Sequence, residues 1–471
     1  MSRLLNDWQC AGPAYAALAR RVRQLIREGQ LVPETRIPPE RTLAEQLGVS
    51  RTTVTKAYDL LRSDGHLHSV RGFGTVIAPP EQGTSGPPGQ PGRPAGAAAR
   101  LSRWRADFTV PTLPTPEPVV ERAVLACAAE IARSLAAVET DPRGLPELRK
   151  ALADRYTARG LPTSPSQLFL TQGTRHAWQL LLKVRARAAA PVLLEAPTSP
   201  QLIDAVRLFG ARLCPVPLTP EGWQVDLIAA ALKQVRPALA FLTPDFQDPT
   251  GRLMPEQDRC RLVEAAQRSG TLLVADESAA ELWLDEQRLE PSMAAHDPLD
   301  TVALIGSSSS ALGCGLPVGW IRAMPAIVNR LALSSTAQGS RSAVSDQVIA
   351  ARLLDRVPEL LAEQRGLLAR RRDLLAAELR STLPHWRFAL PAGGTALWVD
   401  LGAPISTRLA AAGERHGLRL LPGPRFGGGG SYDSHLRLPY TAAERTLREG
   451  VRLLARAHEE ATAGRDLKEL F

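Results

Sequence analysis

The sequence is poor in the residues that cross-link a chain or anchor it in a membrane. Its five cysteines are scattered without a C-x-x-C pair, its eight histidines are dispersed, and no H-x-x-E spacing occurs. We therefore expect neither disulfides nor a metal site. No stretch approaches the roughly 20 uninterrupted apolar residues of a membrane span. The N-terminal MSRLLNDWQCAGP also lacks the basic and apolar regions of a signal peptide. These absences predict a cytoplasmic protein without membrane contact.

Lysine is scarce as well, but the chain is not short of positive charge. With 57 Lys and Arg against 48 Asp and Glu, the 471 residues carry a net charge of +9. Residues 1–78 hold 11 basic and 7 acidic side chains and residues 79–105 hold four and one, which leaves only +2 for the remaining 366 residues. A basic N-terminal region joined to a nearly neutral remainder indicates that the N-terminal region binds an anionic partner, of which nucleic acid is the first candidate. On charge alone it fits a solvated basic surface equally well.

A segment rich in proline and glycine divides the chain. Residues 79–106 read PPEQGTSGPPGQPGRPAGAAARLSRWRA and show no apolar periodicity. The length of the chain, with 44% apolar residues, suffices for two or three domains. We expect residues 79–106 to form a flexible linker that spans on the order of 30 Å. It would join a front domain of residues 1–78 to a large domain of residues 107–471.

The front domain has the pattern of a helix-turn-helix followed by a wing. Helices are expected over residues 14–30, 40–48 and 51–65, with the apolar stripes Leu18, Val22, Leu25 and Ile26, then Leu43, Ala44 and Leu47, then Val54, Tyr58 and Leu61. Gly48 would end the second helix, and Ser50 would cap the third. HLHSVRGFGTVIA (66–78) then predicts two short strands around the turn RGFG.

This front domain resembles the winged helix-turn-helix of the GntR family. The stretch IPPERTLAEQLGVSRTTVTKAYDLLRSDGHL (37–67) follows that family's pattern along its whole length. The resemblance implies that the start of the third helix enters the major groove of a double-stranded DNA operator and that the wing meets the backbone. The expected DNA-binding residues are Arg41, Ser50, Arg51, Thr52, Thr53, Thr55, Lys56, Arg71 and Gly72. Of these, Lys56 fits a plain surface lysine equally well.

In the large domain, helical patterns alternate with short apolar strands. The strands are QLFLTQG, PVLLEAP, ARLCPVPL, ALAFLTP, TLLVADES and TVALIGS. This alternation predicts an α/β fold with a mostly parallel central sheet and a functional site at the carboxyl ends of the strands. One such end, IGSSSSALGCGLPVGW (305–320), runs from a strand into four serines and a glycine-rich turn. By itself it fits a phosphate cradle, a presented nucleophile, or a site that has lost a residue.

The order of the strand-end motifs resembles that of the fold-type I aminotransferases. ETDPRG, LTQGTRHA, EAPTSP, LTPDFQDPTG, VADES, GSSSSALGCGLPVGW and HLRLPY follow one another as in those enzymes. Together with its GntR-like N-terminal domain, the chain is similar to the MocR-type regulators, which join a GntR-type DNA-binding domain to an aminotransferase-like domain. In the enzymes, a lysine forms a Schiff base with pyridoxal phosphate. A carboxylate pairs with the pyridinium nitrogen, and cationic groups hold the phosphate.

Most positions that the resemblance assigns to this cofactor are altered. The Schiff-base lysine falls on Ser310 and a phosphate-binding arginine on Pro317, and none of the five lysines (Lys56, Lys150, Lys183, Lys233 and Lys468) lies at a strand end. The cofactor's other contacts fall on Glu139, Ser199, Asp248 and either Ser278 or Ala279, whereas Asp276 is retained for the pyridinium nitrogen. Two lost cations and two added carboxylates oppose a dianionic phosphate. We therefore expect no covalently bound pyridoxal phosphate and no enzymatic activity.

Arg437, in HLRLPY, matches the arginine that binds a substrate carboxylate in the enzymes. Either the pocket binds a small amine or carboxylate effector between Arg437 and Asp276, or these two residues persist as an internal salt bridge in an empty scaffold. The predicted function is a sequence-specific transcription regulator, located at the nucleoid through DNA. The resemblance implies a homodimer formed by the aminotransferase-like domain. The alternative is a regulator that binds pyridoxal phosphate, or an active aminotransferase.

Overall fold

The computed structural model divides the chain into two compact units, Met1–Arg103 and Trp104–Phe471. It describes residues 5, 13–27, 31, 37–63, 67–70, 74–77, 104–136, 141–285, 290–339, 341–427 and 431–463. The predicted linker therefore lies outside the described residues, apart from its last three positions. Each unit is treated by itself.

The first unit contains three helices and a hairpin among its described residues. These elements are α1 (Ala14–Arg27), α2 (Glu40–Leu47), α3 (Arg51–Ser63), β1 (Leu67–Val70) and β2 (Gly74–Ile77). Gly48 ends α2 in the left-handed conformation, at φ 64°, which suits glycine because it has no Cβ. The strands β1 and β2 pair antiparallel from Leu67 opposite Ile77 to Val70 opposite Gly74. The predicted helix-turn-helix and wing are thus confirmed.

The apolar stripes of the three helices meet in one core. Val22 of α1, Leu43 of α2 and Leu61 of α3 are fully buried. Tyr58 is buried with them, and its hydroxyl donates to the carbonyl of Pro38 at 2.8 Å. Ile26 and Leu47, also expected in the stripes, are half-buried at the edge of this core. Packing of the inner faces leaves the polar start of α3 on the surface.

Eight strands from the described part of the second unit form one sheet. In spatial order they are β4 (Leu168–Thr171), β11 (Gly319–Arg322), β10 (Val302–Ser307), β9 (Leu272–Asp276), β8 (Leu239–Leu242), β5 (Pro191–Ala196), β6 (Arg212–Thr219) and β7 (Gly222–Trp223). From β10 across to β6 all neighbours are parallel. The six predicted strands are present. In addition, β11 lies antiparallel between β10 and β4.

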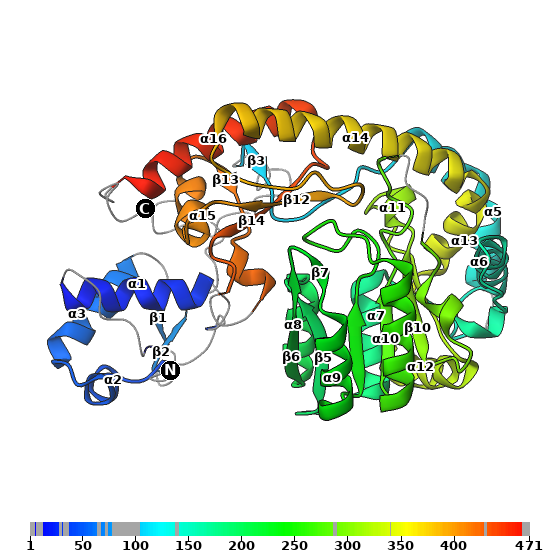
Figure 1. Cartoon of the computed structure of the whole chain (residues 1–471), viewed down its shortest axis with the longest axis horizontal. Helices are drawn as coiled ribbons and strands as arrows, with labels where there is room; N and C mark the ends of the chain where they lie inside the picture. Colours follow the sequence, from blue (N-terminus) through cyan, green and yellow to red (C-terminus); the bar gives the residue numbers. More distant parts are fainter. Residues whose placement is uncertain are drawn as a thin grey trace. The chain divides into compact units, whose positions relative to one another are not determined.

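Alternate residues of these strands point to opposite faces of the sheet, as the two-residue period of a strand requires. On β9, Leu273 and Ala275 join the core under α9 (Val225–Val235) and α10 (Glu256–Ser269). Leu272 and Val274 join the core under α7 (Thr174–Arg185), α8 (Pro200–Phe209) and α12 (Pro325–Gln338). Figure 1 shows the sheet between these helices. A sheet covered on both faces needs apolar strands throughout, which explains runs such as PVLLEA.

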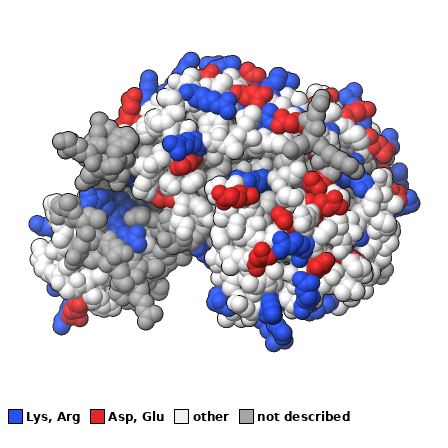
Figure 2. All heavy atoms as spheres, in the orientation of Figure 1, with Lys and Arg blue, Asp and Glu red and all other residues white. Residues whose placement is uncertain are grey.

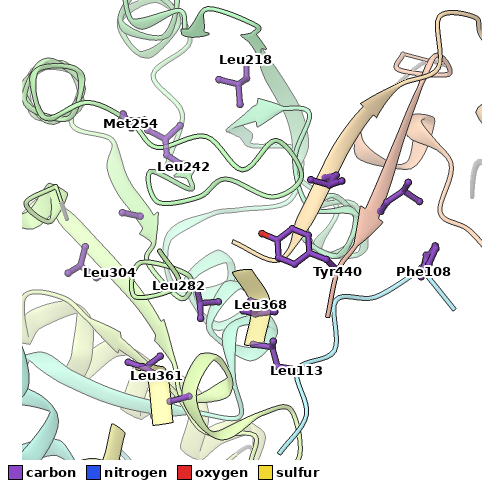
Figure 3. Close-up of a cluster of buried hydrophobic side chains, with 14 of the residues drawn as sticks. Phe108, Leu113, Leu218, Leu242, Met254, Leu282, Leu304, Leu361, Leu368 and Tyr440 are labelled. Atoms are coloured by element: carbon purple, nitrogen blue, oxygen red, sulfur yellow. The ribbon is translucent and has the colours of Figure 1, made fainter. Parts of the chain in front are cut away.

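The remaining elements form the outer parts of the second unit. The helices are α5 (Glu117–Ala136), α6 (Pro146–Ala158), α11 (Ser309–Leu312), α13 (Val344–Leu353), α14 (Val357–Thr382), α15 (Ser406–Arg415) and α16 (Glu444–Thr462). The strands are β3 (Ala106–Asp107), β12 (Ala396–Asp400), β13 (Leu418–Arg419) and β14 (His435–Pro439). β12 pairs antiparallel with β14, and α14 packs along α16. One large core joins these elements to the main sheet, from Leu242 and Leu304 of the sheet to Leu361 of α14 and Tyr440 after β14 (Figure 3).

The second unit starts slightly earlier than the sequence predicts. Trp104, Arg105 and Ala106 were assigned to the linker, but the amide of Arg105 donates to the carbonyl of Gly417 at 2.8 Å. β3 pairs with β13 from Ala106 onward. The boundary therefore lies at residue 104 rather than 107, because these backbone groups are paired in a sheet.

The surface and composition of the described residues add three observations. Lys and Arg are interspersed with Asp and Glu on the face of the second unit that Figure 2 displays, with neither sign dominating. Cys127, Cys214, Cys260 and Cys314 form no disulfide. No described helix is long and apolar enough to cross a membrane, and the described residues hold no group of three or more candidate metal ligands.

Candidate functional site

The start of α3 presents a polar surface. Arg51, Thr52 and Lys56 are exposed, while Thr53 is half-buried. The hydroxyl of Ser50 accepts the backbone N–H of Thr53 at 3.2 Å, so Ser50 caps the helix as predicted. This arrangement leaves the guanidinium of Arg51 available to a base edge or a phosphate at the end of the helix where a recognition helix meets DNA.

Arg41 lies on α2 and is exposed, with 83% of its side chain accessible. Its Nε is 3.1 Å from the carboxylate of Glu45, one helical turn away. Exposed pairs of this kind contribute little to stability, so Arg41 can exchange this partner for a phosphate at small cost. The wing residues Arg71 and Gly72 lie outside the described residues, and their DNA contacts stay predictions.

Thr55 and Lys56 have contacts within the first unit. The hydroxyl of Thr55 donates to Glu40 Oε2 at 2.8 Å, and Arg62 lies 3.4 Å from the other oxygen of the same carboxylate. Lys56 Nζ lies 5.8 Å from the centre of the Tyr15 ring. Glu40, the first residue of α2, thus binds α2 to α3 and holds the recognition helix in place. Sequence reasoning missed this role, because the partners are 15 and 22 residues away.

A cavity of about 220 Å³ opens in the second unit at the carboxyl ends of β8 and β9. Trp178 of α7, Phe246 and Leu282 supply part of its wall. Among the predicted positions, it is lined by Ser199, Asp248, Asp276, Ser278, Ala279 and Ser310. Pro317 is exposed and does not line it, and Glu139 lies outside the described residues. The structure therefore brings six of the eight predicted cofactor positions together in one cavity.

Ser310 lies in α11, directly after β10. It is 7% exposed, lines the cavity, and its side chain makes no hydrogen bond to any described residue. No lysine, arginine or histidine is among the described residues that line the cavity. Lys56 belongs to the first unit, and Lys150, Lys183 and Lys233 lie on α6, α7 and α9, away from the cavity wall. Ser310 thus lines the cavity, at the position that the sequence resemblance assigns to the Schiff-base lysine.

The glycine before the serines has a packing role. Gly306 lies opposite Trp320 in the β10–β11 pair, and a Cβ at position 306 would come within 2.2 Å of the indole. Trp320 in turn donates its Nε1–H to the hydroxyl of Tyr156 at 2.8 Å. The GSSSS stretch therefore starts with glycine to admit a side chain from the neighbouring strand.

Arg437 on β14 is 1% exposed and forms an ion pair with Asp248. Its Nη1 donates to the two carboxylate oxygens at 2.9 and 3.1 Å, and its Nη2 donates to the carbonyl of Thr109. The guanidinium also lies 4.9 Å from the Phe426 ring. The internal salt bridge between Arg437 and Asp276, one of the two alternatives drawn from the sequence, does not form, because the loop after β8 brings Asp248 to the guanidinium. A carboxylate of the protein itself thus pairs with the arginine that the resemblance assigns to a substrate carboxylate.

Asp276 ends β9 and is 9% exposed, yet it forms no ion pair with a described residue. Its carboxylate accepts the backbone N–H of Ser278 at 3.0 Å. Burial raises the pKa of Asp276; hydrogen bonds from Ser278 and Trp178 oppose this rise, and the charge of Asp248 adds to it. The ionised carboxylate of Asp276 therefore has no cationic partner among the described residues.

Glu195 supports the loop that carries Asp248. Its carboxylate accepts hydrogen bonds from Trp223 Nε1 at 2.8 Å and from Gln247 Nε2 and the backbone of Thr243 at 3.1 Å. Burial raises the pKa of Glu195 to about 7, against these three hydrogen bonds. Gln247 precedes Asp248, so this network fixes where that carboxylate lies. A glutamate at the end of the apolar run PVLLE was the available sequence signal, because a buried acid needs partners.

Comparison with known proteins places both units. The model of the gntR family of bacterial regulatory proteins matches residues 14–77, and the model of aminotransferase class I and II matches residues 110–454. The chain is 28% identical to the probable rhizopine catabolism regulatory protein MocR of Rhizobium meliloti, over 81% of this chain and 80% of that protein. The chain belongs to the MocR-type subfamily of GntR regulators.

Other relatives of this MocR-type regulator agree with that assignment. It is 26% identical to the uncharacterized HTH-type transcriptional regulator YisV of Bacillus subtilis, over 93% of this chain and 95% of that one. The α-aminoadipate aminotransferase LysN of Thermus thermophilus is similar in structure, with a TM-score of 0.70 and 29% identity over 77% of this chain and 94% of that chain. The resemblances seen in the sequence are confirmed: the regulator joins a DNA-binding domain to a fold-type I aminotransferase domain.

Proposed function

We propose that this MocR-type regulator binds its DNA operator as a homodimer and that its aminotransferase-type domain senses a small molecule without catalysing a reaction. The observation that carries this proposal is Ser310. Ser310 lines the cavity, the resemblance assigns the Schiff-base lysine to this position, and a hydroxyl cannot form an imine with an aldehyde. Transaminase chemistry requires that imine.

The charge of the cavity wall supports the same proposal. Pyridoxal phosphate carries a phosphate that enzymes hold with cationic side chains. The described residues of this wall include two carboxylates, Asp248 and Asp276, and no cationic side chain. Among the positions that the resemblance assigns to the cofactor, only Asp276 is retained on this wall. The residues present therefore do not fit pyridoxal phosphate.

Borohydride trapping tests this proposal. Purified full-length protein is incubated with pyridoxal phosphate, reduced with borohydride and analysed by intact and peptide mass, with a working aminotransferase as a positive control. We expect only weak labelling spread over exposed lysines. A stoichiometric adduct at one residue would overturn the proposal and favour the alternative, a cofactor-dependent regulator or enzyme.

The homodimer is supported by an exposed apolar stripe on α5. Val124, Ala128 and Leu135 recur at helical spacing and are exposed, Val124 to 41% and Leu135 to 66%. The adjoining side of α5, with Ala123 and Cys127, is buried, and Ile131 packs against the core. An exposed apolar stripe of this kind is typical of a surface that another protein covers. A second copy would bring two DNA-binding domains to the two half-sites of one operator.

Replacing Leu135 by glutamate is expected to shift the full-length protein from dimer to monomer at micromolar concentration, because a charge would be buried at the interface. Analytical ultracentrifugation measures the change. Leu208→Glu is the matched control, since Leu208 is 86% exposed on α8, away from the α5 stripe. If both variants sediment like the wild type, α5 does not form the interface.

A further inference from the structure

The cavity at Ser310 carries an uncompensated negative charge among its described lining residues. Asp248 is neutralised by Arg437, but Asp276 has no cation among the described residues. α7 begins at Thr174 on the cavity wall, and a helix N-terminus supplies about half a positive charge. Half a charge does not compensate a full carboxylate. The cavity as a whole therefore attracts a cation and repels a second carboxylate or a phosphate.

Two acceptors on the cavity wall can serve an ammonium group. The carboxylate of Asp276 has no cationic partner among the described residues and can accept further hydrogen bonds, and the hydroxyl of Ser310 has no hydrogen-bond partner among them. Asp276 is the last residue of β9 and Ser310 comes shortly after β10, and these two strands are neighbours in the sheet. An ammonium group carries donors only, so two acceptors at adjacent strand ends complement it.

The rest of the wall suits a short apolar body. Leu202, Phe241 and Leu282 line the cavity, and Trp178 and Phe246 add aromatic rings that attract cations. A volume of about 220 Å³ is below the roughly 300–1,000 Å³ of sites for drug-sized ligands. The ligand must therefore be small.

We propose that this cavity binds a small primary amine, whose ammonium group is held between Asp276 and Ser310 and whose apolar part lies along Leu202, Phe241 and Leu282. This inference rests on the proposed function, since it takes the domain to be a sensor. It favours an amine over a carboxylate as the effector, because Arg437, the group that would bind a carboxylate, is already paired with Asp248. The amine is bound without a covalent bond.

The first test uses the full-length protein without added cofactor. Its melting temperature and calorimetric affinity are measured with n-butylamine, butyrate and inorganic phosphate. We expect n-butylamine to raise the melting temperature and the two anions to leave it unchanged. A response to butyrate or phosphate without a response to the amine would overturn the proposal. Borohydride trapping on the same sample shows separately whether the non-enzymatic function itself has failed.

Variants of Asp276 test the site directly. Asp276→Asn is expected to weaken n-butylamine binding by roughly tenfold to a hundredfold, because a charge-assisted hydrogen bond is lost. Asp204→Asn is the matched control, since Asp204 lies outside the cavity wall and pairs with Arg425. Equal affinity in both variants and the wild type would exclude Asp276 as the ammonium acceptor.

A tethered ammonium provides a second, independent variant. Ser310→Lys is expected to place an amine beside Asp276, to raise the melting temperature and to abolish the response to n-butylamine. This variant remains informative if Asp276→Asn does not fold. Undiminished binding of n-butylamine to it would place the ligand elsewhere.

The pH dependence has a defined sign. The amine stays charged from about pH 5 to 8, whereas protonation of Asp276, whose pKa burial raises, removes the carboxylate that binds it. Asp248 adds to that rise, while Ser278 and Trp178 oppose it. Affinity should therefore fall as the pH is lowered. Affinity that rises on acidification would contradict the role of Asp276.

Discussion

Replacing Asp248 by alanine is expected to lower the free energy of unfolding by about 3 kcal/mol, because it leaves the guanidinium of Arg437 buried without its carboxylate. Arg437 is 1% exposed, and its Nε already has no hydrogen-bond partner among the described residues. The effect lies near the lower end of the range for a broken buried pair, since the side chain of Asp248 is 32% exposed and water can reach it. Denaturant unfolding measures the change.

Two further variants complete this experiment. Asp204→Ala is the matched control, because Asp204 and Arg425 lie at the same 2.9 Å but are 44% and 22% exposed. It should cost less than about 1 kcal/mol. Arg437→Met combined with Asp248→Ala should cost less than the sum of the single changes, because neither charge is left unpaired. If Asp248→Ala costs no more than Asp204→Ala, Arg437 does not depend on Asp248.

Replacing Arg51 by alanine is expected to weaken specific operator binding by about 1–3 kcal/mol, which is roughly a 5- to 150-fold loss of affinity. Arg51 is exposed at the first turn of α3, where a recognition helix meets base edges. The operator is obtained by selecting bound DNA fragments with the purified protein, and affinity is measured by fluorescence anisotropy at fixed salt.

The comparison with nonspecific DNA separates two roles of Arg51. A base contact would reduce the preference for the operator, whereas a phosphate contact would weaken all DNA equally and lower the salt slope by about one. Arg261→Ala is the control, since Arg261 is a partly exposed arginine on α10 in the other unit. Unchanged operator affinity for Arg51→Ala would remove Arg51 from the DNA interface.

Local sequence pattern was sufficient to predict most helices and strands and many residues of the candidate site. The stripe of Val54, Tyr58 and Leu61 predicted α3, because a helix packed on one side needs apolar residues at its own period. Apolar runs such as TLLVAD predicted strands covered on both faces. Six of the residues named for the cofactor line one cavity, since carboxyl ends of parallel strands meet at one edge. β11 was not foreseen, because its residues GWIR begin with glycine and end with arginine and so lack the apolar run of the other strands in the sheet.

The sequence alone determined that the chain has a GntR-type DNA-binding domain and an aminotransferase-type domain, and it predicts that a serine, Ser310, takes the position of the Schiff-base lysine. These properties depend on residue identity and on spacing along the chain. The tertiary structure decided that Arg437 pairs with Asp248, 189 residues away, rather than with Asp276. It also decided that Glu40 binds α2 to α3 and that Asp276 has no cationic partner among the residues that the structure describes. Pairing between charges depends on distance in space, and the packing of the elements sets that distance.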